Sequence, residues 1–135
     1  MSEVPVDSDS VYARLGGESA LRALVERFYA LMDELPQARA VRRLHPGDLQ
    51  RSADSLFKFL SGWFGGPPLY MRERGHPRLR MRHMPFAIGR AERDQWLLCM
   101  RQALQEQVAE IPLRVAIEQA FVGMAEHLVN RAEPG

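Results

Sequence analysis

Apolar side chains recur every three or four residues between residues 21 and 35, which is the spacing of one face of an α-helix. The positions on this face are Leu21, Leu24, Val25, Phe28, Met32 and Leu35. Ser19 is a candidate N-cap, and Pro36 ends the pattern because proline has no amide N–H to donate. The pattern therefore predicts an amphipathic helix of about four turns.

Three later stretches show the same periodicity. Asp48 is a candidate N-cap for a second long helix, which a glycine- and proline-rich break at residues 65–68 ends. A third helix is expected from Gly89 to about Val108. A fourth opens at Pro112, a residue type that suits the first turn of a helix.

Two other stretches are less regular. Residues 37–44 predict a short helical piece that ends at His45, because the residue before a proline is pushed out of the α region. Prolines interrupt residues 69–88, which predict a loop and a helix of one or two turns beginning at Pro77. The chain is thus expected to be all-α, although periodicity alone does not separate a plain bundle from a helical sandwich around a cofactor.

Composition and charge narrow the class of protein. The 135 residues are 46% apolar, which suits one domain with one core. Eighteen basic and seventeen acidic side chains leave a net charge of +1, so no long-range field favours nucleic acid or an anionic membrane as a partner. Cys99 is the only cysteine and cannot form an intramolecular disulfide. With no apolar run that resembles a signal peptide or a membrane span, we expect a cytoplasmic protein.

The chemistry is concentrated in residues 75–86. His83 lies at the end of a short arginine-rich helical segment, between the apolar residues Met81 and Met84, and Trp96 follows thirteen residues later. An axial ligand of haem iron beside the two propionates would need such a setting. A histidine near a helix end is also a common capping or partly exposed residue.

An ordered set of motifs resembles the group II truncated haemoglobins from about Tyr12 to Asn130. The set comprises Leu15-Gly16-Gly17-Glu18, Phe28-Tyr29, Trp63-Phe64-Gly65-Gly66-Pro67, the run from Gly75 to Phe86, and Trp96. The resemblance implies a globin-like, two-over-two helical sandwich around one haem b. The globin domain would span residues 11–131, with flexible segments at 1–10 and 132–135.

The resemblance also assigns roles on the proximal side of the haem. His83 would be the iron ligand, and Arg82 would pair with a propionate, since arginine binds carboxylates through two hydrogen bonds. Tyr70 is a second candidate at the haem edge, although a tyrosine that simply packs a loop is an equal alternative. Three apolar residues are expected to contact the cofactor, namely Leu56, Phe59 and Phe86.

On the distal side the resemblance assigns Tyr29 and Trp96 to the ligand pocket, where each could donate a hydrogen bond. Ser52, at the position of the distal histidine of larger globins, would leave a side route to the haem. His45 is expected to donate to a bound ligand, to change charge near neutral pH or to move to the iron. Its plainer role is that of a pre-proline residue at a helix end.

Three functions follow from this interpretation. The first is reversible binding of dioxygen, or of carbon monoxide or nitric oxide, at ferrous haem iron. The second is redox chemistry that removes nitric oxide or peroxide and requires a separate reductase, so whether the protein is an enzyme stays open. The third is a non-haem helical interaction module. The sequence leaves monomer and homodimer equally open.

Overall fold

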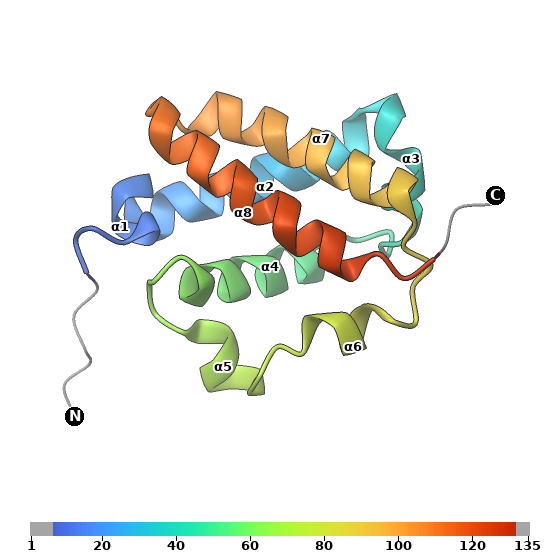
Figure 1. Ribbon diagram of the computed structural model, residues 1–135, viewed down its shortest axis with the longest axis horizontal. Helices are drawn as coiled ribbons and strands as arrows, with labels where there is room; N and C mark the ends of the chain where they lie inside the picture. The colour runs from blue at the N-terminus through green and yellow to red at the C-terminus, as the bar shows by residue number, and fades with distance from the viewer. Residues whose placement is uncertain (1–6, 132–135) are drawn as a thin grey trace.

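The computed structural model describes residues 7–131, and within that range the chain is helical with no strand (Figure 1). Part of the expected flexible segments, residues 1–6 and 132–135, lies outside the described residues. The helices are α1 (Val11–Leu15), α2 (Gly17–Glu34), the 3-10 turn η1 (Pro36–Ala38), α3 (Arg39–Arg43), α4 (Gln50–Trp63), α5 (Leu69–Arg74), α6 (Leu79–His83), α7 (Arg90–Gln107) and α8 (Ile111–Leu128).

The four long helices form two pairs, α2 with α4 and α7 with α8. α2 packs against α4 and α7, and α7 packs in turn against α8. Figure 1 shows α7 and α8 above α4, while the short helices α5 and α6 lie below it. This arrangement confirms the predicted all-α, two-over-two sandwich.

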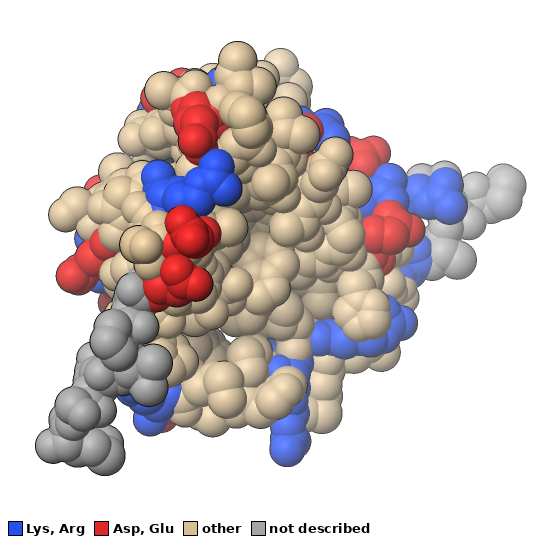
Figure 2. Space-filling model, turned by 60° about the vertical axis from the view of Figure 1, so that its left-hand side comes forward, with Lys and Arg blue, Asp and Glu red and all other residues tan. Residues whose placement is uncertain are grey.

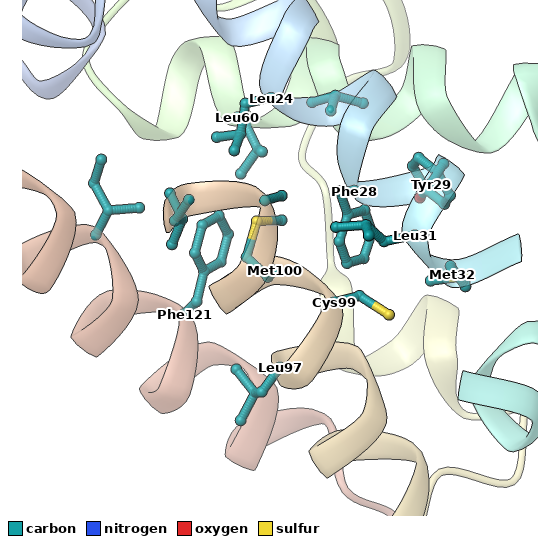
Figure 3. Close-up of a cluster of buried hydrophobic side chains, with 14 of the residues drawn as sticks. Leu24, Phe28, Tyr29, Leu31, Met32, Leu60, Leu97, Cys99, Met100 and Phe121 are labelled. Carbon is teal, nitrogen blue, oxygen red and sulfur yellow. The ribbon is translucent and has the colours of Figure 1, made fainter. Parts of the chain in front are cut away.

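The core lies where the two pairs face each other. Phe28 of α2, Leu60 of α4, Met100 of α7 and Phe121 of α8 are each no more than 1% exposed. Figure 3 shows these side chains converging on one cluster together with Leu24. The apolar periodicities thus place these residues in the core, but they identify the buried face of α4 only in part, because Trp63 is 40% exposed and Phe57 is buried.

One predicted helix cap is wrong and another is confirmed. α2 begins at Gly17 with Gly16 as its N-cap, so Ser19 lies inside the helix rather than capping it. Gly16 adopts φ +121°, a conformation that side chains other than glycine rarely adopt. Asp48 does cap the start of α4: its carboxylate accepts a hydrogen bond from the amide of Gln50, two residues later, at 2.9 Å. Leu49, which lies between them, already has helical dihedral angles.

The middle section is more helical than predicted. Leu69–Arg74 forms α5, although a loop is expected there, and Tyr70 is its only buried residue. The short helix expected at Pro77 begins two residues later, as α6. Val11–Leu15 also forms a helix, α1, whose N-cap Ser10 accepts a hydrogen bond from the Ala13 amide.

Gly66 lies so close to α1 that a side chain would collide with the Tyr12 ring. We expect Gly66→Ala to lower the free energy of unfolding by about 1–3 kcal/mol, because the ring must move aside. Gly123→Ala is the control: it lies in α8 with open space around it, and should raise stability by about 1 kcal/mol. Urea unfolding measures both changes, and equal effects of the two substitutions would contradict the predicted collision.

Candidate functional site

A cavity of about 420 Å³ lies among α4, the segment from α5 to Ile88, and the facing ends of α7 and α8. Its walls are mostly apolar, and Figure 2 shows the hollowed face with few charged side chains inside it. All ten residues that the sequence selects for the site line this cavity: Tyr29, His45, Ser52, Leu56, Phe59, Tyr70, Arg82, His83, Phe86 and Trp96. Segments far apart in the sequence thus meet at one place.

His83, the last residue of α6, has its imidazole ring fixed by its own helix. The Nδ1 atom lies 2.6 Å from the carbonyl oxygen of Leu79, one turn earlier. A carbonyl oxygen only accepts hydrogen bonds, so Nδ1 must carry the proton. In the neutral ring this leaves the lone pair on Nε2, which is the atom that a metal would take.

Arginines surround one edge of the cavity. Arg82 lines the cavity and lies over the ring of buried Tyr70, with 5.9 Å from its guanidinium carbon to the ring centroid. Arg80, two residues earlier, points elsewhere and donates to the His127 carbonyl oxygen. Figure 2 shows basic side chains along the lower edge of the molecule, where α5 and α6 lie in Figure 1. Of these two arginines, only Arg82 lines the cavity.

Tyr29 projects from α2 into the opposite wall and is only 8% exposed. Its hydroxyl donates to the backbone carbonyl of Ser52 over 3.4 Å, which is long for an O–H···O hydrogen bond. Burial raises the pKa of this phenol well above its ordinary value, so the group keeps its proton at neutral pH. The cavity therefore contains a neutral hydroxyl donor that is only weakly engaged.

Trp96 of α7 lies between two core aromatic rings. Its ring centroid is 4.9 Å from that of Phe28 and 5.3 Å from that of Phe121. Such tilted and edge-on contacts favour one orientation of the indole. The core thus holds a second hydrogen-bond donor, the indole N–H, at the cavity wall.

His45 occupies the same wall, with its ring centroid 5.8 Å from that of Tyr29. Its Nδ1 lies 2.9 Å from the Val41 carbonyl oxygen and must donate to it. Burial lowers the pKa of His45, and the nearby Arg42 and His83 lower it further, against the opposing effect of the Val41 hydrogen bond. In the neutral ring the proton therefore lies on Nδ1 and Nε2 is an acceptor, while a role of His45 toward a bound ligand stays a prediction.

Arg42 holds the loop that carries His45. Its guanidinium donates to the carbonyl oxygens of Pro46 at 2.8 Å and Gly47 at 2.9 Å, and its Nε pairs with Asp33 at 3.0 Å. One side chain of α3 thus ties the loop to the end of α2. The loop that carries His45 is consequently held to α3, and through Arg42 to α2.

Several cavity residues have no counterpart in the sequence prediction. Arg51 is one of them. It lies next to Ser52 and one helical turn before Ser55, which also lines the cavity. This helical spacing could have identified Arg51 as a second arginine, besides Arg82, at the cavity opening. Most of the others are apolar and extend the walls: Val41, Leu44, Pro46, Leu79, Ile88, Met124, Ala125 and Leu128. Ser55, Glu92 and Arg93 are the polar or charged exceptions. The apolar pattern of the wall residues looks the same as that of ordinary core residues.

Comparison with known proteins accounts for this arrangement. The family model described as bacterial-like globin matches residues 10–130. The group 2 truncated hemoglobin YjbI of Bacillus subtilis is 38% identical over 117 residues, covering 87% of this chain and 86% of the relative. The chain belongs to the group II truncated haemoglobins.

Solved structures agree with this assignment. The group II 2-on-2 hemoglobin of Agrobacterium tumefaciens has a TM-score of 0.89 and 43% identity, covering 98% of this chain and all of the other. The cold-adapted truncated hemoglobin of Pseudoalteromonas haloplanktis has a TM-score of 0.90 and 41% identity, with coverage of 92% and 100%. The family implies that this truncated haemoglobin has a haem cofactor.

The residues of the cavity fit a haem. Among residues 7–131, no three His, Cys, Asp or Glu side chains come together to hold a bare metal ion. A porphyrin supplies four nitrogen ligands itself, so the single imidazole of His83 suffices at one axial position. The apolar walls suit the macrocycle, and Arg51 and Arg82 at the mouth suit its carboxylates.

Within residues 7–131, no helix is both long and apolar enough to span a bilayer.

Proposed function

We propose that this truncated haemoglobin binds dioxygen reversibly at ferrous haem b. The observation that carries the proposal is the arrangement of the cavity walls. His83, whose Nε2 lone pair is free, lines the cavity. Tyr29 and Trp96, two potential hydrogen-bond donors, line the same cavity. When bound, haem supplies a ferrous iron that takes a diatomic ligand.

The proximal side is proposed to hold the cofactor. His83 Nε2 ligates the iron, while Leu79 keeps the proton on Nδ1 and so fixes the ring and its tautomer. Arg82 and Arg51 pair with the propionates at the mouth of the cavity, and Tyr70 packs at the haem edge. The apolar faces of the macrocycle are covered by Leu56, Phe59 and Phe86, each of which lines the cavity.

The distal side is proposed to stabilise the oxygen ligand. A diatomic ligand with partial negative charge in this cavity would be stabilised by the O–H of Tyr29 and the N–H of Trp96. The Tyr29 hydroxyl can turn from its long contact with Ser52, and the Trp96 indole is already oriented by its aromatic neighbours. In its neutral form His45 has an acceptor at Nε2, which can bind an ordered water and leaves the single Tyr29 hydroxyl proton for the oxygen ligand.

One relative supports oxygen as the ligand. A solved truncated haemoglobin from Bacillus subtilis that is described as oxygen-avid has a TM-score of 0.83 and 36% identity to this chain. The two distal donors proposed here are the kind of groups that slow oxygen release. Slow release therefore favours reversible binding over the removal of nitric oxide, in which the bound oxygen is consumed.

Oxygen release from the Tyr29→Phe variant tests the proposal. Removing one hydrogen bond to a partly charged ligand costs about 1–3 kcal/mol, so oxygen dissociation should become about 5- to 150-fold faster. Stopped-flow displacement of oxygen by carbon monoxide measures the rate. Tyr12→Phe is the matched control, because Tyr12 lies in α1 and does not line the cavity.

Three outcomes would count against the proposal. An unchanged dissociation rate in Tyr29→Phe would remove this hydroxyl from oxygen stabilisation. Stoichiometric oxidation of the wild-type ferrous protein on each exposure to oxygen would favour the redox function instead. Failure of the wild-type chain to take up added haem would leave the helical interaction module.

A further inference from the structure

The helix that carries His83 contributes little to the apolar core. None of the five residues of α6 is buried, and Met81 and Met84 are 57% and 48% exposed. Burial of apolar surface, the main force that fixes a helix in place, is therefore weak here. Other contacts must hold the proximal wall against the rest of the globin.

Asn130 supplies these contacts from the chain segment that follows α8. Its side-chain Nδ2 donates to the carbonyl oxygens of His83 at 3.1 Å and of Phe86 at 3.0 Å. Its side-chain oxygen accepts from the Ile88 amide at 2.9 Å. Its backbone amide donates to the Ile88 carbonyl oxygen at 2.8 Å. One residue thus satisfies four backbone groups between His83 and Ile88.

The contacts join segments that are more than forty residues apart in the sequence. Figure 1 shows the end of the chain after α8 meeting the segment between α6 and α7. A second tie lies nearby, where the Arg80 guanidinium donates to the His127 carbonyl oxygen at 2.6 Å. Asn130 is also the only asparagine in the chain. An asparagine amide supplies both donors and an acceptor, which this set of backbone groups requires.

We infer that Asn130 is a positioning residue for the proximal histidine. The His83 ring is held at Nδ1 by Leu79, and the His83 backbone is held at its carbonyl oxygen by Asn130. Together these contacts fix the direction in which Nε2 points into the cavity. The inference rests on the proposed function, because it assumes that His83 ligates haem iron.

Two variants distinguish the donor atom of the Asn130 side chain, Nδ2, from its acceptor atom, Oδ1. Asn130→Ala removes all of its side-chain hydrogen bonds. Asn130→Asp keeps an acceptor for the Ile88 amide but places a carboxylate, which has no N–H, against the carbonyl oxygens of His83 and Phe86. Gln119→Ala is the matched control, since Gln119 is an exposed amide side chain on α8.

The measurements are made on the haem-loaded protein. Transfer of haem to an excess of a high-affinity apoglobin gives the rate of haem loss. Resonance Raman spectra of the five-coordinate ferrous form give the iron–histidine stretching band. We expect haem loss to be about tenfold faster in Asn130→Ala and faster still in Asn130→Asp. The band should shift or broaden in both variants and stay unchanged in Gln119→Ala.

The iron–histidine band separates positioning from a general loss of stability. A variant that merely unfolds more readily keeps the wild-type band in its folded fraction. Unchanged bands in Asn130→Ala and Asn130→Asp would overturn the inference, whatever the rate of haem loss. A wild-type chain that takes up no haem would overturn the proposed function first, and the inference with it.

Discussion

Replacing His83 with glycine is expected to abolish the iron–histidine band, and added imidazole should restore it. The variant removes the only cavity-lining imidazole on α6 and leaves a space of similar shape. Free imidazole can fill that space and ligate the iron, but it has no covalent link to α6. The restored band should therefore differ in frequency from the wild-type band, because the Leu79 contact no longer sets the ring orientation.

Absorption spectra of the ferric, ferrous and carbon monoxide forms follow this change, and resonance Raman identifies the axial ligand. His76→Gly is the control, because His76 is exposed in the loop before α6 and does not line the cavity. His45→Gly is the decisive comparison, since His45 is the other histidine that lines the cavity. If His45→Gly loses the band and His83→Gly keeps it, the proximal assignment is reversed.

The long helices could be predicted because each buries one apolar face. α2, α4, α7 and α8 repeat apolar residues at helical spacing, and the expected boundaries of α7 and α8 lie within one or two residues of those observed. α5 buries only Tyr70, so its sequence carries no apolar repeat to detect. Helices held by tertiary contacts and turns rather than by an apolar stripe are the ones that periodicity misses.

The membership of the site could be predicted more fully than its chemistry. The resemblance placed ten residues, and all ten line one cavity. The protonation of His45 could not be predicted, because it depends on the Val41 carbonyl oxygen at 2.9 Å and on burial, which only the folded chain defines. Asn130 carries no signal of its own, since its partners lie more than forty residues away. Backbone contacts of this kind leave no periodic trace in a sequence.

The core and the site are coupled through Phe121. This side chain is 0% exposed, and its ring lies 5.4 Å from that of Trp63, 5.9 Å from that of Phe64 and 5.3 Å from that of Trp96. Trp96 is proposed above as a distal donor. A change at Phe121 is therefore expected to affect both the stability of the globin and the behaviour of its ligand.

We expect Phe121→Ala to lower the free energy of unfolding by about 3–5 kcal/mol, because it leaves a cavity among close-packed rings. Val122→Ala is the control: its side chain is 38% exposed, and its substitution should change stability by about 0.5 kcal/mol or less. Urea unfolding at saturating haem measures both changes.

Phe121→Ala should also accelerate oxygen dissociation, since the indole of Trp96 loses one of the two rings that orient it. An unchanged rate in a destabilised variant would mean that Phe28 alone holds the indole, and that core packing and ligand stabilisation are separable in this globin.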